Sequence, residues 1–343
     1  MLIAPDSFVN ELESHIALWG DGMIRNILVP LDGSARAELA IPHATALAAL
    51  SEAVVVLLRV VEDAPGQGPA ADPVHFRFAQ QRAVEYLQGI AADLTAKGMR
   101  TRWEITVGKP AVQIIDFARL SDMDVIVLAT HGRGDATGFA LGGTAHKVVE
   151  RAGMSVMLVP AAEPVSVATA EVVYRRIVVP VDRSTRGDWA VSFGAAIARP
   201  AEGELILVHV IPIPEAASLA PNGGEEQRLA DALIQATRAR AERNLREAVE
   251  QLGATGVSAR YRIAESPHAA ATISDIAAQE GADLTLLVAH GSAGETRLPY
   301  GSVTAQLLTL GSGVTLVLQD QPHPRALEPV EPSPPPRGLA ARP

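Results

Sequence analysis

Two glycine-rich stretches carry residue types that could hold a phosphate group. "VLATHGRGDATGFALGGTA" (Val127–Ala145) and "LLVAHGSAGETRLPYGSVTA" (Leu286–Ala305) each run from an apolar, strand-like segment through glycines into a helix-like segment. Glycine lets the backbone approach a ligand closely, and the N–H groups of such a loop and of the next helix N-terminus favour an anion. Glycine after a parallel strand can also serve turn geometry alone, so a phosphate cradle and a plain turn are both open readings.

Two aspartates occupy matching places before these loops. Asp32 follows the first apolar segment of the chain, and Asp182 follows the corresponding segment in the second half. Ligands of open α/β sheets bind beyond the carboxyl ends of the strands, where the strand order reverses. If the first and fourth strands are neighbours there, Asp32 faces the loop at Gly132, and Asp182 faces the loop at Gly291. Such a carboxylate could accept hydrogen bonds from ribose hydroxyls, or it could cap the following helix together with the serine two residues further on.

The elements that position these residues come from a tandem repeat. A unit of about 140 residues, an ordinary domain size, occurs twice with its motifs in the same order. The repeated segments are NILVPLDGS (26–34) and RIVVPVDRS (176–184), AVVVLLRV (53–60) and ELILVHV (204–210), DVIVLATHG (124–132) and DLTLLVAHG (283–291), GGTAHKVV (142–149) and GSVTAQLL (301–308), and MSVMLVP (154–160) and SGVTLVLQ (312–319).

Each copy alternates β-branched runs with segments of helical period, which predicts βαβ units with helices on both faces of a parallel sheet. The first copy is expected to have strands at 26–31, 53–60, 100–107, 124–129 and 155–159 and helices at 34–50, 74–97, 110–121 and 143–152. The second copy is expected to have strands at 176–181, 204–210, 257–263, 283–289 and 313–318 and a long helix over 225–252.

The repeat also predicts the domain boundaries. These are an N-terminal extension (1–23), a first domain (24–160), a linker (161–174), a second domain (175–319) and a Pro-rich tail (320–343). The extension lacks the basic start of a signal peptide, and Met1 and Met23 are both open as the start of translation. The tail is expected to be disordered. Two loops rich in Pro, Gly and Ala, 62–73 and 213–224, could cover a ligand or simply connect elements.

Composition excludes several classes of function. The formal net charge is −10 and the pI is about 5.4, and there is no basic run, so a nucleic-acid or anionic-membrane partner is not expected. The chain has no cysteine, which rules out thiol catalysis and fits a cytoplasmic location. No segment reaches the about 18 consecutive apolar residues of a membrane span.

Taken together, these residues resemble the universal stress protein family. The family fingerprint is Gly-x-x-Gly, nine residues, then Gly-Ser or Gly-Thr after the fourth strand, with an aspartate in a P-x-D-x-S context. That context is present as "PLDGS" (Pro30–Ser34) and "PVDRS" (Pro180–Ser184), and the nine-residue spacing holds in both copies. The resemblance implies an α/β, adenine nucleotide alpha-hydrolase-like fold. It would comprise two tandem copies of a doubly wound five-stranded parallel sheet with helices on both faces, paired through their last strands.

The family divides into ATP-binding and non-binding groups. In the binding group, the aspartate and the residue closing the second strand contact the adenosine, while the glycines and the Ser or Thr hold the phosphates. The positions that the resemblance assigns to nucleotide, with their immediate neighbours, are Asp32, Val60, Ala129, Gly132, Arg133, Gly142, Gly143 and Thr144 in the first copy and Asp182, Val210, Gly291, Gly301 and Ser302 in the second.

Each copy departs from the fingerprint at a different point. The first glycine is Ala129 in one copy and Val288 in the other, and a β-branched residue is the larger obstacle because it cannot easily adopt φ > 0. The first copy has Gly143 where the family has a hydroxyl, although Thr144 could partly replace it. Losing one hydrogen bond to a charged phosphate costs about 1.5–3 kcal/mol, which weakens binding without abolishing it. Since Arg133 adds a positive charge to the first loop, the first copy is expected to be the stronger site.

No catalytic constellation is present in the sequence. There is no P-loop, HExxH or GxSxG motif, and the histidines have no metal-ligand spacing. His131 and His290 precede the two loops and could carry a proton, but a hydrogen bond that fixes the loop is the favoured reading, since neither has an identifiable partner carboxylate or nucleophile. His209 lies within a strand where the first copy has Arg59, and it is read as structural.

Three functions remain for test. The leading hypothesis is a tandem protein that binds an adenine nucleotide, ATP with or without Mg²⁺, as a regulatory or stress-response module. The alternatives are a slow ATP hydrolase and a nucleotide-free interaction protein. The tandem chain could also associate into a homodimer.

Overall fold

The computed structural model describes residues 24–62, 73–132, 141–161, 171–182, 185–213, 225–290, 300–310 and 313–319. The first half contains β1 (Asn26–Pro30), α2 (Ala35–Glu38), α3 (Ala40–Ser51), β2 (Val54–Val61), α4 (Pro73–Ala96), β3 (Thr101–Val107), α5 (Pro110–Leu120), β4 (Val125–Ala129), α6 (Gly143–Arg151) and β5 (Ser155–Val159). The second half contains β6 (Arg176–Pro180), α7 (Thr185–Ala198), the 3-10 helix η1 (Arg199–Ala201), β7 (Glu204–Pro212), α9 (Glu225–Ala254), β8 (Ser258–Ser266), α10 (Ala269–Gln279), β9 (Leu284–Val288), α11 (Ser302–Leu310) and β10 (Thr315–Leu318).

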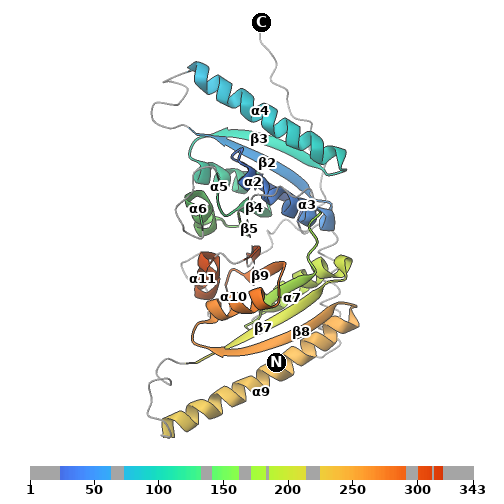
Figure 1. Cartoon of the computed structure of the whole chain (residues 1–343), viewed down its shortest axis with the longest axis vertical. Coiled ribbons are helices and arrows are strands. Elements are labelled where there is room, and N and C mark those ends of the chain that lie inside the picture. The colour runs from blue at the N-terminus through green and yellow to red at the C-terminus, as the bar shows by residue number, and fades with distance from the viewer. Residues whose placement is uncertain are drawn as a thin grey trace.

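These elements form one 10-stranded sheet in the order β3-β2-β1-β4-β5-β10-β9-β6-β7-β8 (Figure 1). The order 3-2-1-4-5 is repeated in the second half, so the expectation of two tandem five-stranded, doubly wound α/β units is confirmed. The described strand pairs within each half are parallel. Among the described residues, no helix is long and apolar enough to cross a membrane.

The two halves join through their last strands. β5 and β10 are antiparallel, and Met157 is paired with Leu316 at the centre of the contact. Because these two residues hold the same position in the two copies, the junction has an approximate twofold axis. The expected pairing through last strands is therefore confirmed.

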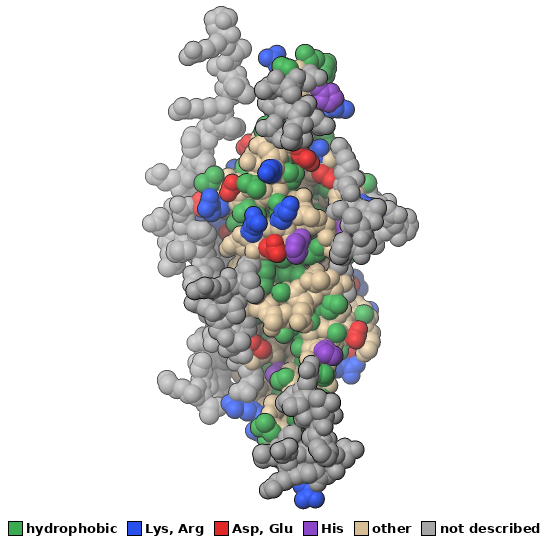
Figure 2. All heavy atoms as spheres, turned by 90° about the vertical axis from the view of Figure 1, so that its left-hand side faces the viewer, with side chains coloured by type: hydrophobic (Ala, Val, Ile, Leu, Met, Phe, Trp, Pro, Cys, Tyr) green, Lys and Arg blue, Asp and Glu red, His purple; other side chains and the backbone are tan. Residues whose placement is uncertain are grey.

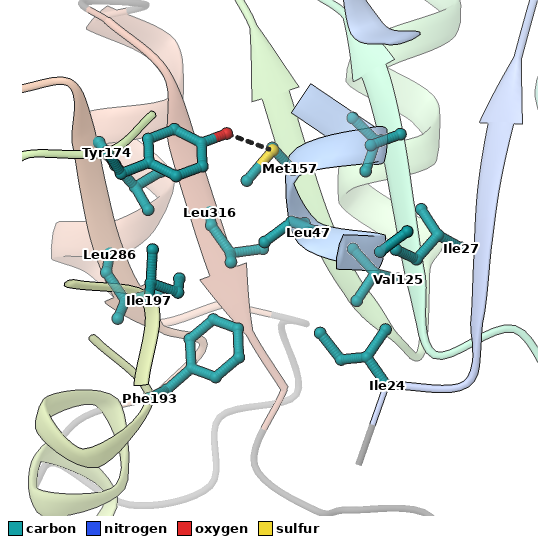
Figure 3. Close-up of a cluster of buried hydrophobic side chains, with 14 of the residues drawn as sticks. Ile24, Ile27, Leu47, Val125, Met157, Tyr174, Phe193, Ile197, Leu286 and Leu316 are labelled. Atoms are coloured by element: carbon teal, nitrogen blue, oxygen red, sulfur yellow. Dashed lines mark hydrogen bonds between the residues drawn. The ribbon is translucent and has the colours of Figure 1, made fainter. Parts of the chain in front are cut away.

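Helices cover both faces of the sheet, so the strands are buried on both sides. One core cluster lies under α3, α4, α7 and α9, the other lies under α5, α6, α10 and α11, and each contains residues from both halves. Figure 3 shows the first cluster where it crosses the junction, with Met157 and Leu47 of the first half near Tyr174 and Leu316 of the second. Each fully buried Leu, Ile or Val contributes about 1.5–3 kcal/mol of hydrophobic stabilisation. Because both clusters contain residues of both halves, this burial also stabilises the junction.

The largest differences from the expected boundaries are at α2–α3 and β8. The helix expected over 34–50 is two helices, because Leu39 forms a turn between α2 and α3. β8 continues three residues beyond its expected end, since it stays paired with β7 as far as Ser266. The extension 1–23, the tail 320–343, most of the loops 62–73 and 213–224, and linker residues 162–170 lie outside the described residues.

The strand order reverses between β1 and β4 in the first half. Their ladder pairs Ile27 with Val125 and Leu28 with Ile126, near the amino ends, whereas the ladder of β1 with β2 continues to Pro30. The ladder between β6 and β9 is equally short. The carboxyl ends of these strands are where an open α/β sheet receives ligands.

Candidate functional site

Asp32 lies just beyond β1 and is held by the start of α2. Its Oδ1 accepts from the backbone N–H of Ser34 at 2.9 Å and from the Ser34 hydroxyl at 2.5 Å. Ser34 is the N-cap of α2, because its Oγ accepts from the N–H of Ala37 at 3.2 Å. The serine therefore caps the helix, and the aspartate orients the serine.

The other carboxylate oxygen of Asp32 lies against Gly132. A Cβ built on Gly132 would meet Oδ2 of Asp32 well inside van der Waals contact, so glycine alone fits this position without a shift. The structure thus brings together the carboxylate after β1 and the loop after β4. Asp182 holds the matching place after β6, but Gly291 and Ser184 lie outside the described residues, as does Arg133.

Both glycine loops are closed at their base by the same hydrogen bond. The N–H of Gly142 donates to the carbonyl of Thr130 at 2.8 Å, and the N–H of Gly301 donates to the carbonyl of Ala289 at 2.7 Å. The loop therefore leaves the end of its strand and returns to it before the next helix begins. Each helix N-terminus is fixed next to the carboxyl end of β4 or β9.

The first turn of α6 is exposed and the helix has no side-chain cap, although the N-cap residue Gly142 is itself buried. Gly142 has an extended backbone and no side chain that could cap the helix. Gly143 and Thr144 form the exposed first turn. A Cβ added to Gly143 would meet nothing within 4 Å. Helix N-terminal N–H groups in this position favour an anion.

Ala129 and Val288 do not stand in the strained conformation that the fingerprint glycine suggested. Both are the last residues of strands, β4 and β9, and each is paired in the sheet ladder. Val288 packs against the core cluster under α3, α4, α7 and α9. A positive φ is therefore not required at Val288, because its backbone is extended, which suits a β-branched residue. That its side chain obstructs a phosphate stays a prediction.

Val60 and Val210 lie on the carboxyl portions of β2 and β7, partly buried against the second core cluster. They do not close their strands, since β2 continues to Val61 and β7 to Pro212. Sheet pairing with β3 and β8 extends both strands past the residues that the sequence marked as their ends. Gly301 and Ser302 begin the second helix, with Ser302 exposed in the first turn of α11.

His131 is engaged with the strand end beside it. Its Nδ1 is 3.2 Å from Oγ1 of Thr130, and that hydroxyl also accepts from the N–H of Ala161 at 3.1 Å. This contact agrees with a loop-fixing role. Among the described residues, no group of three or more His, Asp or Glu side chains could hold a metal ion.

Sequence reasoning missed a pair of polar side chains, Tyr86 and Glu38, on helices near Asp32. Tyr86 on α4 donates to Glu38 Oε1 at 2.8 Å. Burial raises the pKa of Tyr86, the hydrogen bond and charge of Glu38 raise it further, Arg59 lowers it, and Asp32 raises it slightly. The charges of Glu38, Arg59 and Asp32 therefore all act on the Tyr86 hydroxyl. A usable signal was Arg59, a charged residue inside the otherwise apolar run of β2.

Comparison with known proteins gives a consistent result. A sequence model of the universal stress protein family matches residues 23–160 and again residues 173–317. Universal stress protein MJ0531 of Methanocaldococcus jannaschii is 27% identical over 143 residues, which cover 41% of this chain and 84% of that protein.

Two solved structures match both halves. A universal stress protein from Archaeoglobus fulgidus has a TM-score of 0.58 at 19% identity and covers 86% of this chain and 98% of its own. Protein PA1789 of Pseudomonas aeruginosa, described as functionally unknown, has a TM-score of 0.62 at 18% identity and covers 88% of this chain and 94% of its own. Likenesses at this identity show the fold alone. Because the family model matches each half of the chain, the protein belongs to the universal stress protein family.

Proposed function

We propose that the first half binds an adenine nucleotide, ATP, as a regulatory or stress-response module of the cytoplasm. The supporting observation is the contact of the Asp32 carboxylate with Gly132 beside the uncapped start of α6. Asp32 and Val60 would contact the adenosine, while Gly132, Gly142 and the first turn of α6 would bind the phosphates. A chain without cysteine suits a reducing compartment.

The proposal extends to the second half with lower affinity. Asp182, Val210 and Gly301 hold matching positions, and Ser302 adds the hydroxyl that the first half lacks. The loop residues Arg133 and Gly291 belong to the proposed sites by sequence. Mg²⁺ would accompany ATP as a charge-neutralising ion, with its remaining coordination from water. We also propose that the tandem chain forms a homodimer.

The test compares the two aspartates by titration calorimetry with ATP and Mg²⁺. Asp32→Ala is expected to weaken binding about 10- to 100-fold, because it removes a charged hydrogen-bond acceptor worth about 1.5–3 kcal/mol. Asp182→Ala is expected to change affinity less. Equal effects would remove the preference for the first half, and no binding by the wild type at millimolar ATP would contradict the proposal itself.

Two further variants separate ligand binding from helix capping. Asp32→Asn keeps an oxygen that can accept from Ser34 but loses the charge, so its melting temperature should stay near that of the wild type while its affinity falls. Gly143→Ser restores the family hydroxyl in open space, and it should tighten ATP binding several-fold. Mass spectrometry of incubated ATP would show whether ADP accumulates, which is the outcome for a hydrolase.

A further inference from the structure

The outward face of α11 differs in kind from the outward face of α6, its copy in the first half. The two helices have nine residues each and the same place beside the junction, so they can be compared position by position. The exposed residues of α6 include Thr144, His146, Lys147, Glu150 and Arg151. The matching exposed residues of α11, here called the α11 face, are Val303, Ala305, Gln306, Thr309 and Leu310.

Every titratable side chain on α6 is thus replaced by an uncharged one on the α11 face. Val303 is 37% exposed and Leu310 is 49% exposed, although both are large and apolar. A groove of about 430 Å³ between α11 and α10 is lined by Leu310 and Ala305 of α11 and by His268, Ala270 and Ala271 at the start of α10. Figure 2 shows the same contrast, with charged side chains gathered over α5 and α6 and few over the adjoining surface of α11 and α10.

We propose that the α11 face is the surface through which two copies of this chain associate. A twofold contact places a patch against itself, so charges of one sign within the patch would face each other. The chain carries a net charge of −10, and two copies therefore repel except where charge is absent. The α11 face lacks charge, and the small side chain of Ala305 allows a second helix to approach closely. The charged α6 face, built on the same backbone, is the internal contrast.

The test is light scattering coupled to size-exclusion chromatography over a dilution series. The wild type should show a mass of twice 36.0 kDa at high concentration and should dissociate on dilution. Gln306→Lys with Leu310→Arg places the residue types of α6 on α11, where the fold already tolerates them, and it should weaken association at least tenfold. The matched control, Lys147→Gln with Arg151→Leu on α6, should leave the mass unchanged.

Melting curves check that each variant remains folded. A wild type that stays monomeric throughout the series would overturn the proposal. So would a dimer that the α11 double variant leaves intact, because the contact would then lie on another surface, including one for a different partner.

A second inference concerns the carbonyl groups next to the two aspartates. Nη1 of Arg59 on β2 donates to the carbonyl of Leu31 at 3.2 Å. In the second half, Nδ1 of His209 on β7 donates to the carbonyl of Val181 at 2.7 Å. A carbonyl can only accept, so the imidazole carries its proton on Nδ1. Two unlike side chains make the same contact at the same position of the repeat.

These carbonyls belong to the residues directly before Asp32 and Asp182. The N–H groups of the same two residues still donate to the neighbouring strand, to Leu58 at 2.8 Å and to Val208 at 2.9 Å. Each peptide is therefore held from both sides at the point where the chain leaves the sheet. We infer that Arg59 and His209 are positioning residues that fix the direction in which the two carboxylates project; for ligand binding this rests on the proposed nucleotide function.

Replacing Arg59 by histidine, the residue that makes this contact in the second half, tests this inference. Arg59→His keeps a donor for Leu31, whereas Arg59→Leu removes it. Hydrogen exchange at residues 31–34 should accelerate in Arg59→Leu and remain slow in Arg59→His. Unchanged exchange in Arg59→Leu would overturn the inference without any reference to ligand.

Nucleotide affinity supplies the second readout. Arg59→Leu should lose about tenfold in ATP affinity and Arg59→His should recover most of it, which a general loss of stability would not produce. If wild-type protein binds no ATP, the proposed function fails, while hydrogen exchange still tests whether Arg59 fixes the backbone at Leu31. If wild type binds ATP and Arg59→Leu binds it equally well, the positioning role fails alone.

Discussion

His43 is a buried imidazole whose titration should be visible in stability. It lies on α3, its Nδ1 is 2.8 Å from Tyr174 Oη, and that hydroxyl reaches Met157 Sδ at 3.8 Å (Figure 3). Burial lowers the pKa of His43 from 6.5 to about 4. The unfolded chain therefore binds a proton first as pH falls, and the free energy of unfolding drops between pH 6.5 and 4 and is level above that range.

The size of this drop is about 3 kcal/mol at most, at 1.36 kcal/mol per pKa unit. Urea titrations at several pH values from 7.5 to 4.5 should show a shallower pH dependence for His43→Phe than for the wild type. Parallel curves for wild type and His43→Phe would contradict the expectation.

At the residue scale, the sequence predicted which side chains meet but not how they are held. The contact of Asp32 with Gly132 followed from the strand order that the repeat implied, because strand ends at a switch point converge. The extended backbone of Val288 could not be predicted, since a fingerprint states a residue type and says nothing of its φ angle. The hydrogen bonds of Arg59 and His209 to the carbonyls of Leu31 and Val181 could not be predicted either, because an arginine and a histidine share no sequence pattern.

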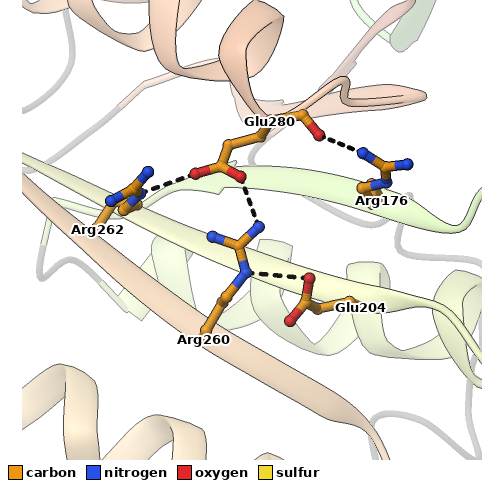
Figure 4. A network of polar contacts seen from close by, with 5 residues as sticks. All are labelled: Arg176, Glu204, Arg260, Arg262 and Glu280. Atoms are coloured by element: carbon orange, nitrogen blue, oxygen red, sulfur yellow. Dashed lines mark hydrogen bonds and ion pairs between the residues drawn. The ribbon is translucent and has the colours of Figure 1, made fainter.

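An ion-pair network joins the C-terminal end of α10 to β7 and β8. Glu280, the C-cap of α10, accepts from Arg260 at 2.6 Å and from Arg262 at 2.8 Å, and Arg260 also contacts Glu204 at 3.0 Å (Figure 4). The backbone carbonyl of Glu280 accepts from Arg176 at 2.8 Å. A carboxylate at a helix C-terminus is unfavourable alone, so the arginines offset the helix dipole there.

The same network should make the protein less stable in acid, at a lower pH than the titration of His43 does. Hydrogen bonds from Arg260, then Arg262, lower the pKa of Glu280 from 4.5 to about 2. The stabilisation is complete above about pH 4.5 and is lost as pH falls through 2. Glu280→Gln should lower the free energy of unfolding by about 1 kcal/mol at pH 7, since exposed ion pairs contribute little each, and by almost nothing near pH 2. Denaturant titration measures this, with Glu247→Gln on α9 as a control that should have no effect.

At the scale of elements, the alternating pattern predicted the strands of both halves, the helices of the first half and the long helix α9, but it assigned no range to α7 or α10. It joined α2 and α3 because nothing in the apolar pattern marks the turn at Leu39. It ended β8 early because strand length there is set by pairing with β7, a contact between segments far apart in sequence. Periodicity also could not predict the ion pairs of Glu280. The repeat gives no hint of them, because the C-cap of α5 at the matching position is Ser121.

At the scale of the whole molecule, the repeat predicted two units and the family resemblance predicted their pairing. What neither supplied was the continuity of the result, in which one sheet and two shared core clusters run across both units. That continuity depends on side chains such as Tyr174, which precedes β6 in sequence but is buried against the first half. Composition could indicate buried strands, but the partner of each buried side chain required the three-dimensional arrangement.

The antiparallel contact of β5 with β10 also separates the two proposed nucleotide sites electrically. All strands of the first half point one way and those of the second half point the other, so Asp32 and Asp182 lie at opposite edges of the sheet. A five-residue strand spans ~17 Å, about twice the ~8 Å Debye length at physiological ionic strength. Two bound polyphosphates would therefore not sense each other's charge through solvent. Any cooperativity between them would have to travel through the core that the halves share.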